Sequence, residues 1–396
     1  MILILPDYYQ EFACLAAACQ DSCCVGWEID IDDETFDYYK SIEGPFGKRL
    51  RDHMRTDGCN SFLLQERRCP FLNKENLCDI CIELGEESLC EICTEYPRFT
   101  MEYGSFREKC LGLSCEEAGR LIFAKEAPTG FVEMELAEEA ESDEDWEAME
   151  DWEDAAQEVT AEELSEEEMQ ALKQARDHCI HILQNRTYPL KERIARYLAF
   201  ADWVQEQMNL GQLREMGKKP DTEFSDTQLP DLEGSSQKIT VGKLLSDKKR
   251  ILEGMELLDT EWERAKKETE QYLIADNYIQ RMQAFEQAYQ DRNYEYEHLL
   301  VYFTFRYFMR AVYDQNFLEK AQFAVFSMLV IRDMDGARFW KKDKVFDKKD
   351  RIDVARIFSK EVEHSEENME YLGESILYEE LMQIPTLLKW LNLHVF

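Results

Sequence analysis

The cysteines constrain this chain most, because twelve of the thirteen lie within the first 115 of its 396 residues. Such a concentration indicates either a disulfide framework or a metal site. The first twelve residues lack the basic flank and long apolar core of a secretion signal, and the apolar run 321–331 is too short to span a bilayer. We therefore expect a soluble, cytoplasmic protein, where clustered thiols hold metal more often than they form disulfides.

The charge of the chain narrows its possible partners. It carries 83 acidic and 46 basic residues, a formal net charge of −37. Such a surface repels phosphate backbones and anionic lipids, which disfavours nucleic acid and membranes and favours a basic protein partner. Residues 133–168 hold 19 acidic residues and no Lys or Arg, which is typical of a solvated linker.

The hydrophobic pattern predicts a mainly α fold. With 44% apolar residues, the chain can bury a large core, and its 16 Gly and 9 Pro argue against a many-stranded β protein. Helical periodicity dominates after the acidic stretch, and residues 299–313 are apolar on all sides, as in a helix at the centre of a bundle. We predict a cysteine-rich metal-binding domain of short helices and loops over 1–125, an acidic linker over 126–168 and a helical bundle over 169–396.

The cysteine spacing favours metal ligation. Cys14, Cys19, Cys23 and Cys24 form one group, and Cys69 begins a second group that includes the pairs Cys78/Cys81 and Cys90/Cys93. A C-x2-C pair lets two thiolates bind one ion across a tight turn. Twelve thiols exceed the four that one zinc ion or one [4Fe–4S] cluster uses, and all-sulfur ligation suits both. The roles of Cys110 and Cys115 stay open.

A polar stripe near the C-terminus is a candidate site. If residues 352–368 form one helix, Glu361, His364, Ser365 and Asn368 share a face at i, i+3, i+4 and i+7. A His beside carboxylates could act as an acid or base, although an ordinary Glu-rich surface helix fits the pattern too. Arg306 and Arg310 in the apolar helix need acidic or ligand partners if buried, and an internal ion pair is the simpler expectation. No Rossmann, P-loop or nucleophile-elbow motif is present.

Several segments together resemble the flagellin lysine-N-methylase family. They are YYQEFACLAAACQDSCCVGWEIDID, CPFLNKENLCDI, LGEESLCEICTEYPR, LSCEEAGRLI, EHLLVYFTFRYFMRAVYD and SKEVEHSEENMEYL. The resemblance covers both ends of the chain and leaves out its acidic middle. It implies transfer of a methyl group from S-adenosylmethionine to flagellin lysines, and an iron–sulfur cluster held by N-terminal cysteines, with zinc as the alternative.

The resemblance also implies roles for individual residues. The metal-binding positions are Cys14, Cys19, Cys23, Cys24, Cys69, Cys78 and Cys93, whereas Cys81 and Cys90 are additions to the family pattern. His364 and Asn368 fall on its H-S-x-x-N motif, so the expected catalytic residues are Glu363, His364 and Asn368, and the expected cofactor-binding residues are Arg306 and Glu361. The competing interpretation is a non-catalytic zinc-binding module whose helical half binds a partner protein.

Overall fold

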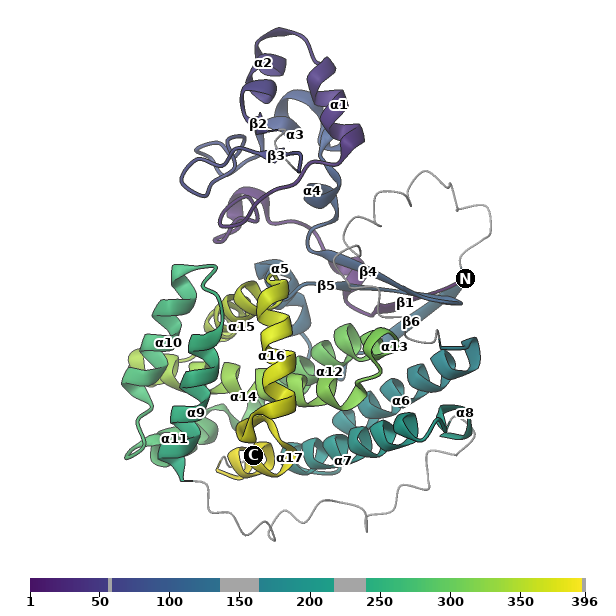
Figure 1. Cartoon of the computed structure of the whole chain (residues 1–396). Coiled ribbons are helices and arrows are strands. Elements are labelled where there is room, and N and C mark those ends of the chain that lie inside the picture. Colours follow the sequence, from purple (N-terminus) through teal and green to yellow (C-terminus); the bar gives the residue numbers. More distant parts are fainter. Residues whose placement is uncertain (56–58, 136–163, 217–239, 394–396) are drawn as a thin grey trace.

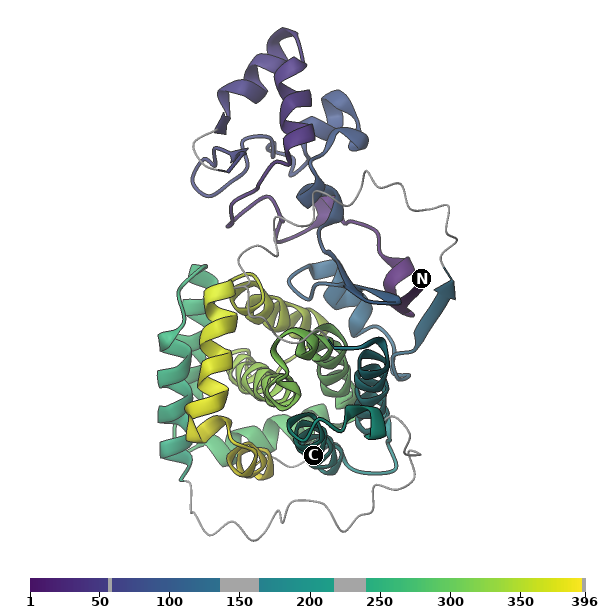
Figure 2. The same cartoon turned by 45° about the vertical axis from the view of Figure 1, so that its right-hand side comes forward.

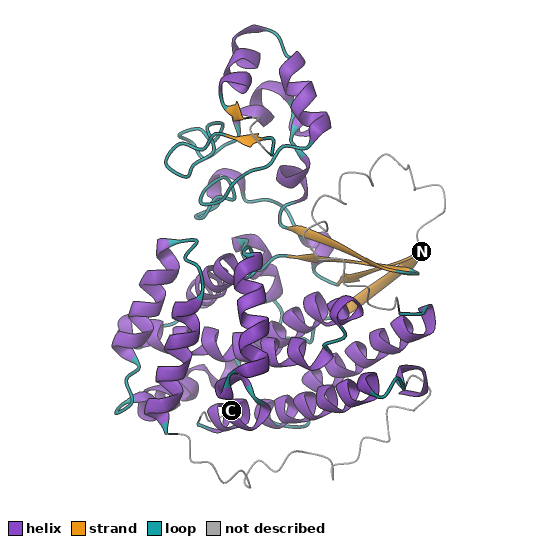
Figure 3. Cartoon of the chain, viewed as in Figure 1, coloured by secondary structure: helices purple, strands orange, loops and turns teal. Residues whose placement is uncertain are grey.

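The computed structural model describes residues 1–55, 59–135, 164–216 and 240–393. This part of the chain is mainly helical, which confirms the expected fold class (Figure 3). Most of the acidic stretch, residues 136–163, lies outside the described residues. The boundaries at 125 and 168 stay predictions, although residues of the expected linker form a strand, β6 (Phe131–Glu135), and begin a helix, α6 (Glu166–Gln184).

Residues 24–93 form a small lobe with a hydrophobic core of its own, which we call the thiol lobe (Figure 1). Phe62 and Phe71 pack at its centre with ring centroids 5.1 Å apart. Asp32 begins the first helix of the lobe by accepting the Thr35 backbone N–H at 2.8 Å. The lobe contains α1 (Asp33–Ser41), α2 (Gly44–Asp52), β2 (Met54–Arg55), β3 (Ser61–Phe62), α3 (Asp79–Leu84) and α4 (Glu91–Glu95).

A four-stranded mixed sheet, which the sequence did not predict, lies beside the helical domain in the order β4-β5-β1-β6 (Figure 1). Its other strands are β1 (Ile2–Pro6), β4 (Arg98–Tyr103) and β5 (Phe106–Leu111). Strand β1 runs parallel to β5, with Ile2 opposite Phe106, and antiparallel to β6, with Ile2 opposite Glu135. These pairings join segments about a hundred residues or more apart, so no local sequence pattern predicts them. Helix α5 (Glu116–Ile122) lies between β5 and β6 in the chain and, like β1, β4 and β5, packs into the main core.

The helical domain is arranged around α14 (Phe317–Lys341), which contacts helices on several of its sides. Two views show α9 and α10 on one side of it and α6 and α7 on the other (Figures 1 and 2). No helix among the described residues is long and apolar enough to cross a membrane. The remaining helices are α7 (Leu190–Asn209), α8 (Leu213–Met216), α9 (Val241–Gly254), α10 (Thr260–Tyr272), α11 (Tyr278–Tyr289), α12 (Tyr294–Tyr307), α13 (Ala311–Asp314), α15 (Lys348–Val362), α16 (Glu366–Tyr378) and α17 (Ile384–Asn392).

The apolar segment 299–313 is buried in the bundle as predicted, as far as Met309. It is not one helix, because α12 ends at Tyr307 and a 3-10 turn leads into α13.

The expected single helix over 352–368 was wrong. Helix α15 ends at Val362 and α16 begins at Glu366, with Glu363, His364 and Ser365 between them. The break has a local cause, since the Ser365 hydroxyl accepts the Asn368 backbone N–H at 3.0 Å and thereby caps a new helix. Helical periodicity continues across such a break, which is why the sequence conceals it.

Charged residues lie deep in the bundle along α14. Asp333 pairs with Lys248 of α9, and Asp335 pairs with Arg351 of α15 at 2.6 Å. The second carboxylate oxygen of Asp335 has no hydrogen-bond partner among the described residues. Burial therefore dominates and raises the pKa of Asp335 to about 7, although Arg351 opposes the rise.

This pKa predicts how stability depends on pH. Between about pH 4 and pH 7 the folded protein keeps a proton on Asp335 that the unfolded chain has lost, so the contribution of this group to stability falls as pH rises. Asp335→Asn should remove this dependence, which amounts to at most about 3 kcal/mol between pH 5 and pH 8 in urea unfolding. Asp276→Asn, at an exposed position, should leave the pH dependence as it is in the wild type. Parallel curves for Asp335→Asn and wild type would contradict the prediction.

Candidate active site

The link between α15 and α16 separates the predicted C-terminal residues into two sets. Glu363 and His364 face α12 and the segment that follows β5. Glu361, Ser365 and Asn368 face the loop that joins α9 to α10. The structure thus brings the two expected acid/base residues together and gives the other polar residues different partners.

Glu363 is a buried carboxylate with two unlike oxygens. Its Oε2 accepts the Tyr302 hydroxyl at 2.8 Å and the Tyr307 hydroxyl at 2.7 Å, and lies 3.0 Å from Nε of Arg306. Its Oε1 has no hydrogen-bond partner among the described residues, although the side chain is only 1% exposed. Since unsatisfied buried oxygens are costly, Oε1 keeps an unused acceptor position.

Arg306, an expected cofactor-binding residue, is instead an internal partner of Glu363. This confirms the simpler expectation of an ion pair. The guanidinium also lies 3.3 Å from the ring centroid of Phe99 and donates to the Cys110 sulfur at 3.6 Å. Arg310, by contrast, is exposed.

His364 is held in a ring of aromatic side chains. The rings of Trp27, Tyr96 and Phe99 lie with their centroids 5.8, 6.1 and 6.3 Å from the imidazole. Its Nε2 is 2.7 Å from the Ser114 hydroxyl. Burial, followed by the charges of nearby cationic groups, lowers the pKa of His364 to about 4, so the imidazole is neutral near pH 7.

Glu361 and Asn368 hold the loop between α9 and α10. The two oxygens of Glu361 accept the backbone N–H groups of Leu258 and Asp259 at 3.1 and 3.0 Å, and burial raises the Glu361 pKa to about 7. The Asn368 amide accepts the Glu256 N–H at 2.8 Å and donates to the Glu361 carbonyl at 2.8 Å. Both residues are thus engaged with backbone groups, and the expected roles of Glu361 in cofactor binding and of Asn368 in catalysis stay predictions.

The thiols gather in two groups, and all thirteen cysteines are free. The first group surrounds Cys69, whose pKa is raised to about 12 by burial and then by the neighbouring thiols of Cys24, Cys78 and Cys90. The pairs Cys78/Cys81 and Cys90/Cys93 have interacting side chains, as the C-x2-C spacing suggests. The first group thus lies within the thiol lobe.

The second group lies where the thiol lobe meets the helical domain. Burial raises the pKa of Cys115 to about 11, and the thiols of Cys19 and Cys14 raise it further. The pKa of the Cys23 thiol is raised chiefly by its neighbour Cys24 and by burial, and the thiols of Cys14 and Cys115 raise it further. Seven predicted metal-binding cysteines are therefore divided between two neighbourhoods.

The thiols do not form a ready ligand set for a metal. Across residues 1–55, 59–135, 164–216 and 240–393, no three His, Cys, Asp or Glu side chains converge closely enough to hold an ion. All-sulfur donors have the right chemistry for zinc or an iron–sulfur cluster, so metal binding by these cysteines stays a prediction. The chemistry of Glu363 and His364 is accordingly derived without a metal.

Ion pairs fix the second thiol group close to His364. Asp21 pairs with Arg356 and, at 3.1 Å, with Lys360, both on α15. The Trp27 indole, which contacts His364, donates to the Cys23 carbonyl. The thiol lobe consequently lies above α5 and α15, with the candidate site at the junction (Figure 1).

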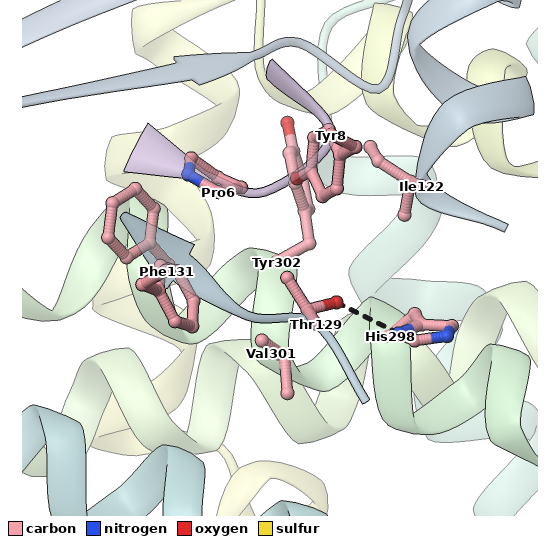
Figure 4. A pocket seen from close by; sticks show the side chains of 9 residues that line it. Pro6, Tyr8, Ile122, Thr129, Phe131, His298, Val301 and Tyr302 are labelled. Carbon is pink, nitrogen blue, oxygen red and sulfur yellow. Dashed lines mark hydrogen bonds between the residues drawn. The ribbon is translucent and has the colours of Figure 1, made fainter. Parts of the chain in front are cut away.

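A small cavity lies nearby, between the sheet and α12 (Figure 4). Tyr8, Phe131 and Tyr302 line it, and His298 bonds to Thr129 at its edge with a 3.0 Å distance. The cavity holds about 10 Å³, which is room for one water molecule. It is far too small for a nucleotide-sized ligand.

Two features missed by the sequence interpretation complete the site. Tyr302 and Tyr307 are the hydroxyl donors to Glu363, and Ser114 is the partner of His364. The two tyrosines lie on the same helix as Arg306, within five residues of it, so a search for polar atoms around that buried arginine could have found them. Ser114 is 250 positions from His364, and no sequence signal joins them.

The fold and site define a helical protein in which a thiol-rich lobe covers a buried carboxylate, arginine and tyrosine cluster. The family model described as the FliB lysine N-methylase C-terminal domain matches residues 176–390, more than half of the chain. The chain therefore belongs to the FliB lysine N-methylase family, which confirms the resemblance seen in the sequence. No solved structure matches significantly.

Individual relatives are distant. The chain is 28% identical over 120 residues to the Lysine-N-methylase of Salmonella typhimurium and to that of Salmonella choleraesuis, covering 28% of this chain and 30% of each relative. It is 27% identical over 120 residues to the Flagellar biosynthetic protein FliU of Salmonella muenchen, covering 28% of this chain and 71% of that one. The chain thus spans less than a third of the two methylases it matches.

The contacts of Asn368 predict a structural role. Asn368→Ala removes bonds to the loop between α9 and α10 and to the end of α15, and should lower the free energy of unfolding by about 2 kcal/mol. Asn209→Ala, at an exposed position, should change it by less than about 0.5 kcal/mol. Urea unfolding of both variants checks this, and an unchanged stability for Asn368→Ala would assign the amide another role.

Proposed function

We propose that this protein is a protein-lysine N-methyltransferase that uses S-adenosylmethionine and methylates flagellin in the cytoplasm. The observation that carries the proposal is Oε1 of buried Glu363, which has no partner among the described residues, beside an Oε2 that accepts two hydroxyls and pairs with Arg306. An amine N–H is a donor of the kind that Oε1 lacks. The names of the relatives, Lysine-N-methylase and a flagellar biosynthetic protein, support both the reaction and the substrate.

The amine must lose a proton before it can attack a methyl group. A neutral His364 with a pKa of about 4 is a poor base for a lysine ammonium of pKa about 10.4, because the transfer costs about 9 kcal/mol. Burial of the lysine at the junction lowers its own pKa and favours the neutral amine, whose proton leaves to solvent. His364 then serves as a hydrogen-bond acceptor that orients the nitrogen lone pair.

Glu363 holds the amine without trapping it as an ammonium ion. An isolated carboxylate would favour the charged lysine. Here Arg306, Tyr302 and Tyr307 already balance the carboxylate through its other oxygen. Oε1 can therefore accept an N–H while the site as a whole keeps little net charge.

The methyl donor supplies the chemistry that this site lacks. When bound, S-adenosylmethionine offers a methyl group on a positively charged sulfur. The amine nitrogen gains the new N–C bond, the C–S bond breaks and its electron pair stays on sulfur, leaving a neutral thioether. The aromatic rings of Trp27, Tyr96 and Phe99 are suited to a cationic sulfur, because ring faces attract cations.

The charge of the chain fits a lysine-bearing protein substrate. A net charge of −37 raises the local concentration of basic segments and accelerates their encounter with the surface. Such attraction weakens with salt. Electrostatic attraction does not select one lysine over another. That specificity must come from contacts at the junction between the thiol lobe and the helical domain.

We extend the proposal to the thiols, which we expect to hold an iron–sulfur cluster when the protein is made under reducing conditions. Support comes from the family and from the all-sulfur composition of the two groups. Zinc is the alternative, and it would favour the non-catalytic module. No step of the methyl transfer depends on either.

The proposed role of the Glu363 carboxylate predicts how substitutions change methylation activity. Glu363→Gln keeps the size of the side chain but loses the charge that pairs with Arg306, and methylation should fall about 100-fold. Anaerobic protein is incubated with S-adenosylmethionine and flagellin, and methyl mass on lysine is measured. Glu367→Gln, exposed on α16, should keep full activity. Wild-type activity in Glu363→Gln would exclude this site, and an inactive wild type would exclude the reaction.

The cluster predicts the metal content. Anaerobically purified protein should contain iron and sulfide and absorb near 400 nm. The Cys69→Ser/Cys78→Ser variant should lose the iron, the sulfide and this absorption. Cys59→Ser, at an exposed thiol, should retain them. Elemental analysis that finds zinc would support the interaction module, and full iron in the double variant would remove these two cysteines from the ligand set.

A further inference from the structure

Ser114 joins the two halves of the molecule at the candidate site. It follows β5 and is 4% exposed. Its hydroxyl is 2.7 Å from Nε2 of His364 and 3.2 Å from the Tyr96 hydroxyl. The chain between β5 and α5 therefore reaches a residue that lies 250 positions away.

The residue before Ser114 holds the other half of the site. The backbone N–H of Leu113 donates to the Tyr302 hydroxyl at 3.1 Å, and that hydroxyl donates to Glu363. Two consecutive residues thus brace both groups that the proposed reaction uses. A shift of this short segment would move Glu363 and His364 together.

The hydrogen bond of Ser114 distinguishes the two ring nitrogens of His364. Among the described residues Nε2 has a hydrogen-bond partner and Nδ1 has none. A nitrogen tied to a fixed hydroxyl holds the ring in one orientation, and the tautomer is Nε2–H when that hydroxyl accepts and Nδ1–H when it donates. The nearby aromatic rings restrict the plane of the imidazole but cannot choose between its nitrogens.

We propose that Ser114 is a positioning residue that accepts Nε2–H of His364 and so leaves the lone pair of Nδ1 facing the substrate amine. The inference rests on the proposed function for its effect on catalysis, but the tautomer itself does not. Tyr96 supports the arrangement, because burial raises its pKa far above 10 and keeps its hydroxyl as a neutral hydrogen-bonding group. The charged groups around the imidazole are Arg306 of α12 and Lys360 of α15, with Glu363 adjacent in the chain.

The first test reads the tautomer and needs no activity. The full-length protein is labelled with ¹⁵N-histidine, and the signals of His364 among the six histidines are assigned with His364→Gln. The wild type should show one tautomer with the proton on Nε2, and Ser114→Ala should show averaged ring-nitrogen shifts. Ser114→Thr keeps the hydroxyl and should restore the wild-type pattern. A Nδ1–H tautomer, or identical spectra for wild type and Ser114→Ala, would overturn the proposal.

The second test measures the catalytic effect. In the flagellin assay Ser114→Ala should lower kcat about tenfold with KM changed less than twofold, and Ser114→Thr should recover most of kcat. Ser375→Ala removes a comparably buried hydroxyl on α16 and should leave kcat unchanged, which separates positioning from a general loss of packing. If the wild type is inactive but the tautomer changes as expected, the proposed function fails and the role of Ser114 stands. If kcat is unchanged in Ser114→Ala, its role in catalysis is refuted.

Discussion

The ion pair between Glu363 and Arg306 is the contact on which the rest of the site depends. A buried carboxylate is tolerated only with its charge balanced, and here Arg306, Tyr302 and Tyr307 all converge on one of its oxygens. The pair joins the link between α15 and α16 to α12. Because removal of one partner would leave the other charge buried and unpaired, these elements must assemble together.

The position of the thiol lobe follows from a second set of charges. Asp21 meets Arg356 and Lys360 on α15, and Arg67 of the lobe donates to the Leu258 carbonyl in the loop between α9 and α10. Glu361 and Asn368 hold that loop from the other side. The polar residues of this region therefore have two roles. Glu363 and His364 lie at the candidate site, whereas Glu361 and Asn368 hold the loop that the thiol lobe contacts.

The sequence predicted a good part of this arrangement. Buried arginine in an apolar helix led to the ion pair of Arg306, and the polar stripe led to His364. Glu363 was expected as a carboxylate beside that histidine. The break after Val362 was missed because a capped helix start keeps the same hydrophobic period as a continuous helix. The partners Tyr302, Tyr307 and Ser114 were missed because hydroxyl side chains in apolar or turn segments look the same whether or not they meet a carboxylate or an imidazole.

The mainly helical fold, the cysteine-rich character of the first 115 residues and the family could be predicted from periodicity, composition and motifs, because these are local properties. The same reasoning predicted the burial of segment 299–313, which holds as far as Met309. The packed structure was needed to show that β1 pairs with strands near residues 106 and 131, that the thiols form two adjoining groups, and that Glu363 keeps one oxygen without a partner among the described residues. Each of these is a meeting of residues far apart in the chain. Such meetings depend on how whole elements pack, and no local stretch of sequence carries that information.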